Sequence, residues 1–529
     1  MRRESARGDS GQVFIMVALL LTSLFGFMGL VIDVGWFQVN LARIQRAADA
    51  AALAGTVYLP GNVPGAINAA KNAAAQNNYV DGVGGVTVTA AQDSLNPDLL
   101  RADVAAPVSM FFLRLFGVST VNGHRNARAE FILPVQMGSP QDYLGIYQLR
   151  QTDGTAVPVG SAPNAGTGPA LASQGFWAAV ISMGGNSNNG DAYSTTHHGG
   201  GTNPQYDPAG YYYMVSLPAG TTNGEVWLFD PSFCAVGHGS SGVYLGTGDH
   251  WIGAGGGTAM TTTYRLWDPH GTPYSIGNDT LIVDTGNTFA LQNQVDMGPL
   301  YGGDGRYGDS GYNGSSSADC QNDPYHNQWY KLAGGLVAGF YHLQVTTSSS
   351  DNINVNAENM FGIEAITNGP PGAAVYGLSR MCAYNNVPSG TSTFYLARVP
   401  ATLAGKTLQI QLFDPGDTGG DAFIRVKQPT PTGYVNAMFS YTANGGAGSQ
   451  SGTNVTQIQT SVSGREQYDG SWVTITIPLP VTYGSGGLTP PGETQPGWWK
   501  IEYQITSTGN DTITYQVGIR GNPVHLVTP

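Results

Sequence analysis

The residues best suited to chemistry are three aspartates in the segment FDPGDTGGD. Asp414, Asp417 and Asp421 supply carboxylate oxygens, and the glycines between them let a loop fold around an ion. Calcium prefers oxygen ligands in a flexible loop, although this spacing is not that of an EF-hand. The segment therefore predicts either a calcium site or a turn followed by a hairpin tip, and no other cofactor is indicated.

The sequence predicts that the protein is not an enzyme. It contains no G-x-S-x-G, H-E-x-x-H or G-x-x-x-x-G-K-[ST] motif. Its formal net charge of −13, with only 11% charged residues, argues against nucleic-acid binding, which needs clustered Lys and Arg. Low charge combined with 75 Gly and 27 Tyr is instead typical of exported β-structure.

The three cysteines show no CxxC spacing, which argues against zinc and thioredoxin-type chemistry. An exported body would permit one disulfide. We expect it between Cys234 and Cys320, which both fall in loops that only the first half of the β-rich body has. Cys382 would then remain a thiol.

One uncharged apolar run, Val13 to Ile32, determines where the chain resides. At about 1.5 Å per residue it measures roughly 30 Å, the thickness of the hydrocarbon core of a bilayer. It is longer than the apolar core of a cleaved signal peptide, so we expect a retained anchor, with a signal peptide or a core helix as alternatives. Arg2, Arg3 and Arg7 place residues 1–11 in the cytoplasm, the span at 12–32, and the body outside.

Helix-favouring sequence continues beyond the span without a break. Asp33 either ends the span at the level of the head groups or pairs with a partner subunit. Further on, small residues recur at helical spacing. We predict that Ala48, Ala51 and Gly55 pack against a partner helix, in this chain or in another subunit.

Residues 33–135 are expected to form a small α+β module. A second Ala-rich helix is predicted over 64–76, and strand-like segments lie at 86–88, 100–108 and 128–135. Residues 110–116 are typical of a short amphipathic helix that ends at Gly117.

The segment GQVFIMVALLLTSLFGFMGLVIDVGWFQVNLARIQRAADAAALAG resembles the N-terminal module of the TadE/TadG-like family of Flp pilus-assembly proteins. FFLRLFGV followed by RNARAEF is similar to the closing part of the same module, so the resemblance covers about residues 8–135. It implies a role in Tad pilus or secretion machinery, or an envelope protein that uses the same anchor.

The sequence differs from other members of this family in two respects, which narrow the subgroup that it resembles. Prepilin-like members carry Glu at the fifth residue after a cleaved Gly; counted from Gly11, that residue is Met16. The chain also lacks the D-x-S-x-S motif of the von Willebrand factor A domain found in many TadG-like proteins. An uncleaved TadG-like anchor therefore fits best.

The remaining sequence predicts two tandem all-β sandwich domains, at 136–367 and 368–529. Four elements recur in the same order. The first two are a pair of strands in 211–231, which resembles 394–415. The third is GFYHLQV at 339–345, which resembles GWWKIEY at 497–503, and the fourth, after a polar turn, is 361–363, which resembles 517–519. These sandwiches are also generically similar to pre-peptidase C-terminal domains.

Several tryptophans in this body are expected to be core or rim aromatics, with a sugar-stacking platform as the alternative: Trp227, Trp329, Trp472, Trp498 and Trp499. The leading hypothesis is a single-pass, non-catalytic envelope protein that engages Tad pilus or secretion subunits, or itself, through its N-terminal helix. The alternative is a surface adhesin or glycan-binding protein that uses the anchor only for attachment.

Overall fold

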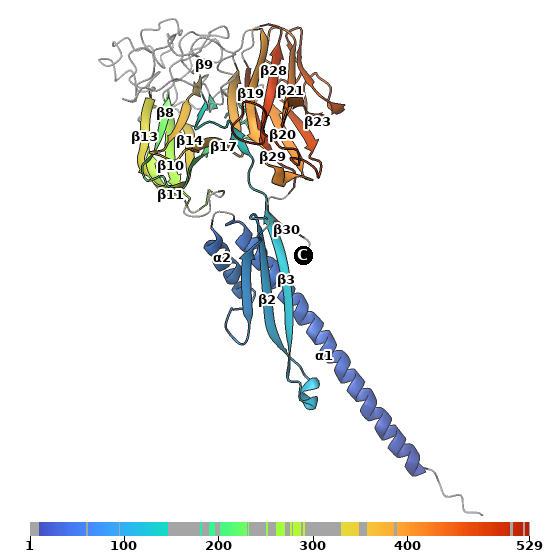
Figure 1. Ribbon diagram of the computed structural model, residues 1–529. Coiled ribbons are helices and arrows are strands. Elements are labelled where there is room, and N and C mark those ends of the chain that lie inside the picture. Colours follow the sequence, from blue (N-terminus) through green and yellow to red (C-terminus); the bar gives the residue numbers. More distant parts are fainter. Residues whose placement is uncertain are drawn as a thin grey trace, which may run out of the picture. The chain divides into compact units, whose positions relative to one another are not determined.

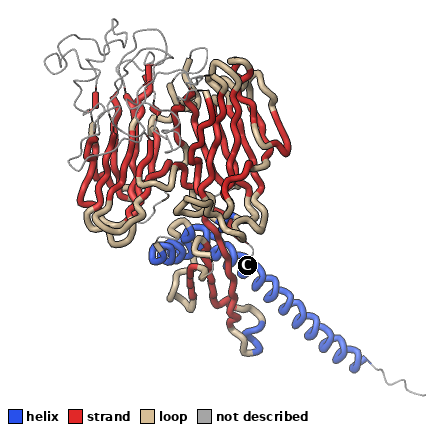
Figure 2. The backbone as a smooth tube through the Cα atoms, turned by 45° about the horizontal axis from the view of Figure 1, so that its top comes forward, coloured by secondary structure: helices blue, strands red, loops and turns tan. Residues whose placement is uncertain are grey.

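The computed structural model divides the chain into two compact units, residues 1–133 with 522–529 and residues 134–521. It describes residues 10–59, 62–94, 96–145, 180–181, 190–195, 201–229, 231, 250–251, 261–269, 274, 276–277, 279–286, 289–290, 329–348, 357–385, 389–507, 511–521 and 524–527. Figures 1 and 2 show a helical unit with a small sheet and a second unit built almost wholly of strands.

The first unit combines two helices with one antiparallel sheet (Figure 1). The helices are α1 (Ser10–Thr56) and α2 (Val63–Gln76). The strands lie in the order β1 (Thr87–Gln92), β2 (Leu99–Ser109), β3 (Thr120–Phe131) and β30 (Val524–Val527). A 3₁₀ turn, η1 (Leu113–Phe116), lies in the loop between β2 and β3. The predicted long apolar N-terminal helix and the small α+β module after it are confirmed.

The two halves of α1 have different surroundings. Nearly all side chains between 13 and 32 are exposed in the protein itself, whereas the later half supplies Leu41, Ile44 and Ala48 to a core shared with α2, β2 and β3. α2 contributes its alanine face to the same core. Asn62 caps α2 by accepting a hydrogen bond from the Gly65 amide at 2.9 Å.

The second unit is built around one long sheet that carries both halves of the predicted repeat. Its order is β11-β10-β14-β7-β17-β4-β19-β28-β21-β25-β26, with β12 and β22 attached. The bounds are β4 (Gln136–Gly138), β7 (Tyr211–Leu217), β10 (Thr261–Asp268), β11 (Thr280–Asp284), β12 (Phe289–Ala290), β14 (Gly339–Ser348), β17 (Ala374–Leu378), β19 (Gly390–Arg398), β21 (Ala422–Thr430), β22 (Gly433–Asn436), β25 (Ile458–Val462), β26 (Arg465–Glu466) and β28 (Trp498–Ile505).

The described residues of this unit form three further sheets. One has the order β13-β8-β16-β5, another β18-β29-β20-β27-β23-β24, and a small one β6-β15-β9. The bounds are β5 (Tyr143–Gly145), β6 (Val180–Ile181), β8 (Gly224–Phe229), β9 (His250–Trp251), β13 (Trp329–Leu336), β15 (Ala357–Met360), β16 (Gly362–Ile366), β18 (Met381–Asn385), β20 (Thr407–Phe413), β23 (Phe439–Ala443), β24 (Ser451–Val455), β27 (Trp472–Pro478) and β29 (Asp511–Ile519). A short 3₁₀ turn spans Ala401–Leu403.

The four elements of the sequence repeat take equivalent places in the two halves. In the first half β7 pairs with β14, and β8 pairs with β16 in the facing sheet. In the second half β19 pairs with β28, and β20 pairs with β29. The outer neighbours correspond as well, since β10 pairs with β14 as β21 pairs with β28. The prediction of two similar all-β halves therefore agrees with the strand pairing.

The boundaries between the predicted parts differ in two places. β17 follows the expected junction at 367 but pairs with β7 of the first half, and β4 bridges β17 and β19. β30, expected in the second sandwich, pairs with β3 of the first unit. Backbone pairing extends a sheet wherever an edge is open, so strands at a sequence boundary can join either neighbour.

Candidate functional site

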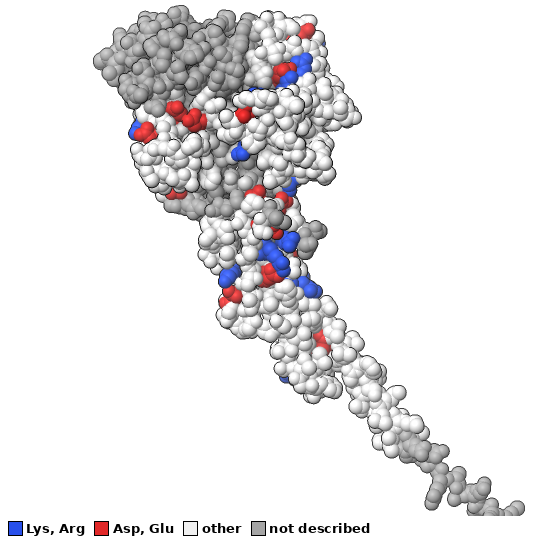
Figure 3. Space-filling model, in the orientation of Figure 1, with Lys and Arg blue, Asp and Glu red and all other residues white. Residues whose placement is uncertain are grey.

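The apolar half of α1 is the first component of the candidate site. Among the described residues there is one helix long and apolar enough to cross a membrane, and it is this one. The run between 13 and 32 contains no charged residue, and the distal part of the helix is white in Figure 3. Its large apolar side chains, such as Phe14 and Phe27, both at least 70% exposed, form a continuous apolar surface that suits a nonpolar environment.

The small-residue stripe Ala48, Ala51 and Gly55 packs inside the first unit, so of the two predicted partners, this chain or another subunit, the structure shows the one in this chain. Ala48 and Ala51 are fully buried in the core that α1 shares with α2 and the sheet. A Cβ on Gly55 would lie 2.6 Å from the Ala66 carbonyl oxygen and 2.3 Å from a methyl carbon of Leu100. The small residues let α2 and β2 approach α1, so their spacing serves packing within the chain.

Asp33 holds a loop of its own chain. Its carboxylate accepts hydrogen bonds from the backbone amides of Phe111 at 2.8 Å, Phe112 at 2.9 Å and Leu113 at 2.6 Å. The side chain is 1% exposed. The sequence left a choice between a head-group position and a contact with a partner subunit, and neither anticipated this link between α1 and the turn η1.

The loop between β2 and β3, residues 110–119, lies against α1. A Cβ on Gly29 would meet the Phe112 ring at 2.8 Å, and the Phe111 ring lies 5.4 Å from that of Trp36. Between the loop and the helix runs an open groove of about 330 Å³, lined by Ser23, Gly26, Phe27, Leu30, Phe112, Leu113 and Phe116. A side chain at position 29 would have to displace the Phe112 side chain, so glycine allows this close contact.

The expected helix over 110–116 is shorter in the structure. Only Leu113–Phe116 form a 3₁₀ turn, and Gly117 ends it with a left-handed φ of 85°. The position of the turn and its glycine stop are confirmed. The side chain that fixes its start was not foreseen, because Asp33 lies 80 residues earlier than Leu113.

The aspartates proposed as calcium ligands have different partners in the structure. Asp421 Oδ1 accepts a hydrogen bond from the Ser463 amide at 2.7 Å. Asp414 and Asp417 instead interact electrostatically with acids from distant segments: Glu466, Asp469 and Asp511. Across the described ranges, no group of three or more His, Cys, Asp or Glu side chains is placed to hold a metal ion.

Burial raises the pKa of Asp414 and Asp417 well above the ordinary range, and the neighbouring carboxylates raise it further. Burial also raises the pKa of Asp511 to about 7. Asp511 Oδ2 accepts hydrogen bonds from the Tyr503 hydroxyl and from the Gly416 amide, the latter at 2.9 Å. Gly416 and Asp511 are 95 residues apart in sequence, so the FDPGDTGGD motif alone could not reveal this contact.

Of the three cysteines, only Cys382 lies among the described residues. Cys234 and Cys320 lie outside the described residues, so their disulfide remains a prediction. Cys382 is a fully buried thiol in β18.

The five tryptophans named from the sequence are buried or half-buried. Trp498 and Trp499 are at most 2% exposed, and the Trp499 indole donates to the Tyr483 hydroxyl at 2.9 Å. The other three of the expected set are half-buried: Trp227, Trp329 and Trp472. Their interpretation as core or rim aromatics is confirmed.

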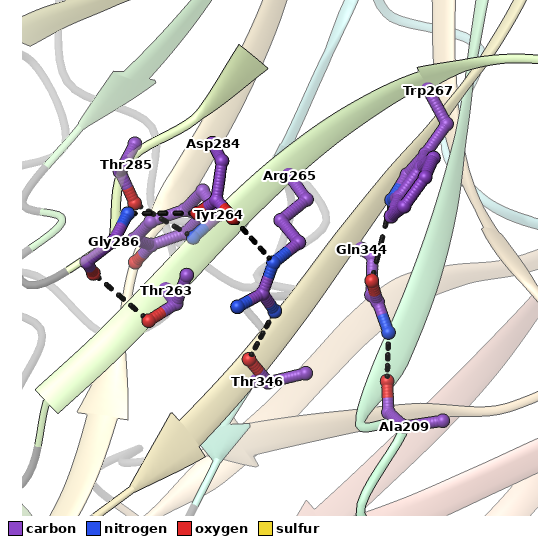
Figure 4. A network of polar contacts seen from close by, with 10 residues as sticks. All are labelled: Ala209, Thr263, Tyr264, Arg265, Trp267, Asp284, Thr285, Gly286, Gln344 and Thr346. Atoms are coloured by element: carbon purple, nitrogen blue, oxygen red, sulfur yellow. Dashed lines mark hydrogen bonds and ion pairs between the residues drawn. The ribbon is translucent and has the colours of Figure 1, made fainter. Parts of the chain in front are cut away.

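Polar side chains on the face of β10 and β14 are used in bonds between strands (Figure 4). Arg265 donates to Asp284 at 2.9 Å and to the Thr346 hydroxyl at 3.0 Å. The Trp267 indole donates to Gln344 Oε1 at 3.2 Å. These side chains link β10, β11 and β14, so their hydrogen bonds stabilise the sheet.

Comparison with known families adds one finding to this geometry. Residues 11–75 match a family model described as Flp pilus-assembly TadE/G-like. The match covers the apolar and buried halves of α1 and nearly all of α2, which confirms the resemblance for that part of the module. No curated protein matches the chain.

Proposed function

We propose that the protein is a membrane-anchored, extracytoplasmic structural component of a Tad-type Flp pilus-assembly or secretion system, without catalytic activity of its own. The observation that carries this proposal is α1, whose exposed apolar half continues without interruption into the core of a folded unit. Because α1 is one continuous helix, its apolar half would hold the folded unit at a fixed distance from the membrane. The family match lies on this same helix.

The proposed orientation follows from the flanking basic residues. Arg2, Arg3 and Arg7 precede the apolar run, while Arg43 and Arg46 lie more than ten residues beyond it. The positive-inside rule then puts the N-terminus in the cytoplasm and the β-rich unit outside. Its partners would be pilus or secretion subunits, or a second copy of the chain.

A role as adhesin or glycan-binding protein is less well supported. Sugar-binding platforms present open aromatic rings with polar neighbours, whereas the described tryptophans discussed above are packed or half-buried. Packed aromatics serve the stability of the sandwiches, which favours a scaffold.

The proposal is tested by isolating the full chain, tagged at its C-terminus, from membranes of its native host in mild detergent. We expect enrichment of Tad ATPase, secretin-like or pilin subunits over an equally tagged, unrelated single-span protein. Protease added to intact spheroplasts should remove the tag. Recovery of the chain in the soluble fraction, or no enriched pilus or secretion subunit, would contradict the proposal. Glycan binding without such subunits would favour the adhesin.

A further inference from the structure

The loop 110–119 presents a compact apolar surface next to the anchor. Five of its side chains are between 40% and 78% exposed: Phe111, Phe112, Leu115, Phe116 and Val118. Arg114 is the only charged residue of the loop. So many exposed aromatic and aliphatic groups in ten residues mark a surface that contacts a nonpolar partner.

Most backbone amides of the loop donate hydrogen bonds within the protein and do not need water as an acceptor. The amides of Phe111, Phe112 and Leu113 donate to Asp33. Four more amides donate to carbonyl oxygens within the loop, those of Met110, Leu115, Gly117 and Val118. A backbone polar group without a hydrogen-bond partner is costly in lipid. Seven of the ten amides of this loop have an acceptor within the protein, which lowers the cost of placing its backbone next to lipid.

The position of the loop along α1 places it at the depth of lipid. Phe112 packs on Gly29, four residues before Asp33, or about 6 Å further into the predicted span at 1.5 Å per residue. The groove between loop and helix continues to Ser23. On the opposite side of Asp33, Trp36 stacks near Phe111, and tryptophan is favoured at the membrane interface.

We propose that residues 110–119 enter the bilayer leaflet nearest the first unit, with Leu115 and Phe116 in contact with acyl chains and lipid filling the groove against α1. The inference rests on the proposed role of α1 as a membrane span. The argument for lipid is continuity, because the exposed face of the loop adjoins the exposed apolar face of the span itself. The chain then contacts the membrane at two points, which restricts rotation of the first unit about α1.

Photocrosslinking of the full chain in vesicles of phosphatidylcholine and phosphatidylglycerol tests this proposal. Benzoyl-phenylalanine replaces Phe116, which is 78% exposed, so the substitution does not disturb the core. Phe25, within the span, is the positive control. Leu526 in β30 is a matched negative control, because it is an exposed apolar residue on the same sheet, where β30 pairs with the end of β3 remote from the loop. An alkyne-tagged phosphatidylcholine reports lipid adducts.

We expect adducts at positions 116 and 25 at least tenfold above those at position 526. Adducts at 25 without adducts at 116 would overturn the inference while leaving the anchor intact. Adducts at neither position would overturn both. Adducts from 116 to a second polypeptide in place of lipid would show that a protein covers the loop, and would also overturn the inference.

Discussion

Replacing Asp33 by alanine should release the loop 110–119 from α1. The carboxylate accepts three backbone amides, and hydrogen bonds to charged groups contribute about 1.5–3 kcal/mol each. Because such contributions are not additive, we take about 3 kcal/mol as the loss of local stability. This corresponds to an increase of about 100-fold in the opening of these amides.

Hydrogen–deuterium exchange of the full chain in detergent measures this change at peptides covering 110–119. Asp49→Ala is the matched control, since Asp49 lies on the same helix and accepts a hydrogen bond from Gln45 at 2.8 Å without touching the loop. Exchange at 110–119 should rise in Asp33→Ala and stay unchanged in Asp49→Ala. If exchange in Asp33→Ala remains within about threefold of wild type, the carboxylate does not hold the loop and the reasoning fails.

Three further predictions concern the two cores. Ala51→Leu overfills a fully buried position and should destabilise the first unit by about 1–3 kcal/mol, seen in calorimetry as a lower melting transition for that unit alone; loss of partner binding at unchanged melting would contradict this. Because burial raises the pKa of Asp511 to about 7 from 3.8, the folded state retains a proton that the unfolded chain loses. The free energy of unfolding should therefore fall between pH 4 and pH 7, by about 4 kcal/mol at most for this group, and urea titrations at pH 4.5 and 8 should show a smaller fall in Asp511→Asn. An equal fall in the variant would exclude Asp511 as the source. Since no group of three or more His, Cys, Asp or Glu side chains among the described residues is placed to hold a metal ion, millimolar calcium should leave the melting temperature at pH 8 unchanged; a rise abolished by Asp414→Asn would instead establish a calcium site.

Local patterns were sufficient for the main parts of the fold. An uncharged run of membrane length is recognised from composition, because the cost of exposing apolar side chains to water depends on the segment itself. The glycine stop at Gly117 is also local, since only its own φ requires it. The repeat could be predicted because equivalent strands keep equivalent side-chain alternation, and their pairing follows from this.

Other features required the tertiary structure. The sequence showed that Ala48, Ala51 and Gly55 are small, but small residues permit close approach by any neighbour, and only the fold shows that α2 and β2 occupy that space. The partners of Asp414 likewise come from segments more than 50 residues away.

Composition and repetition along the chain are enough to predict a long apolar helix and a repeated β-body after it. The roles of the polar and small residues along that helix follow only from the folded structure. Asp33 binds amides of a loop 80 residues away, and the groove between that loop and α1 exists only once both are folded. The reason is physical: hydrophobicity is a property of a segment, whereas a hydrogen bond or a packing contact is a property of two segments brought together.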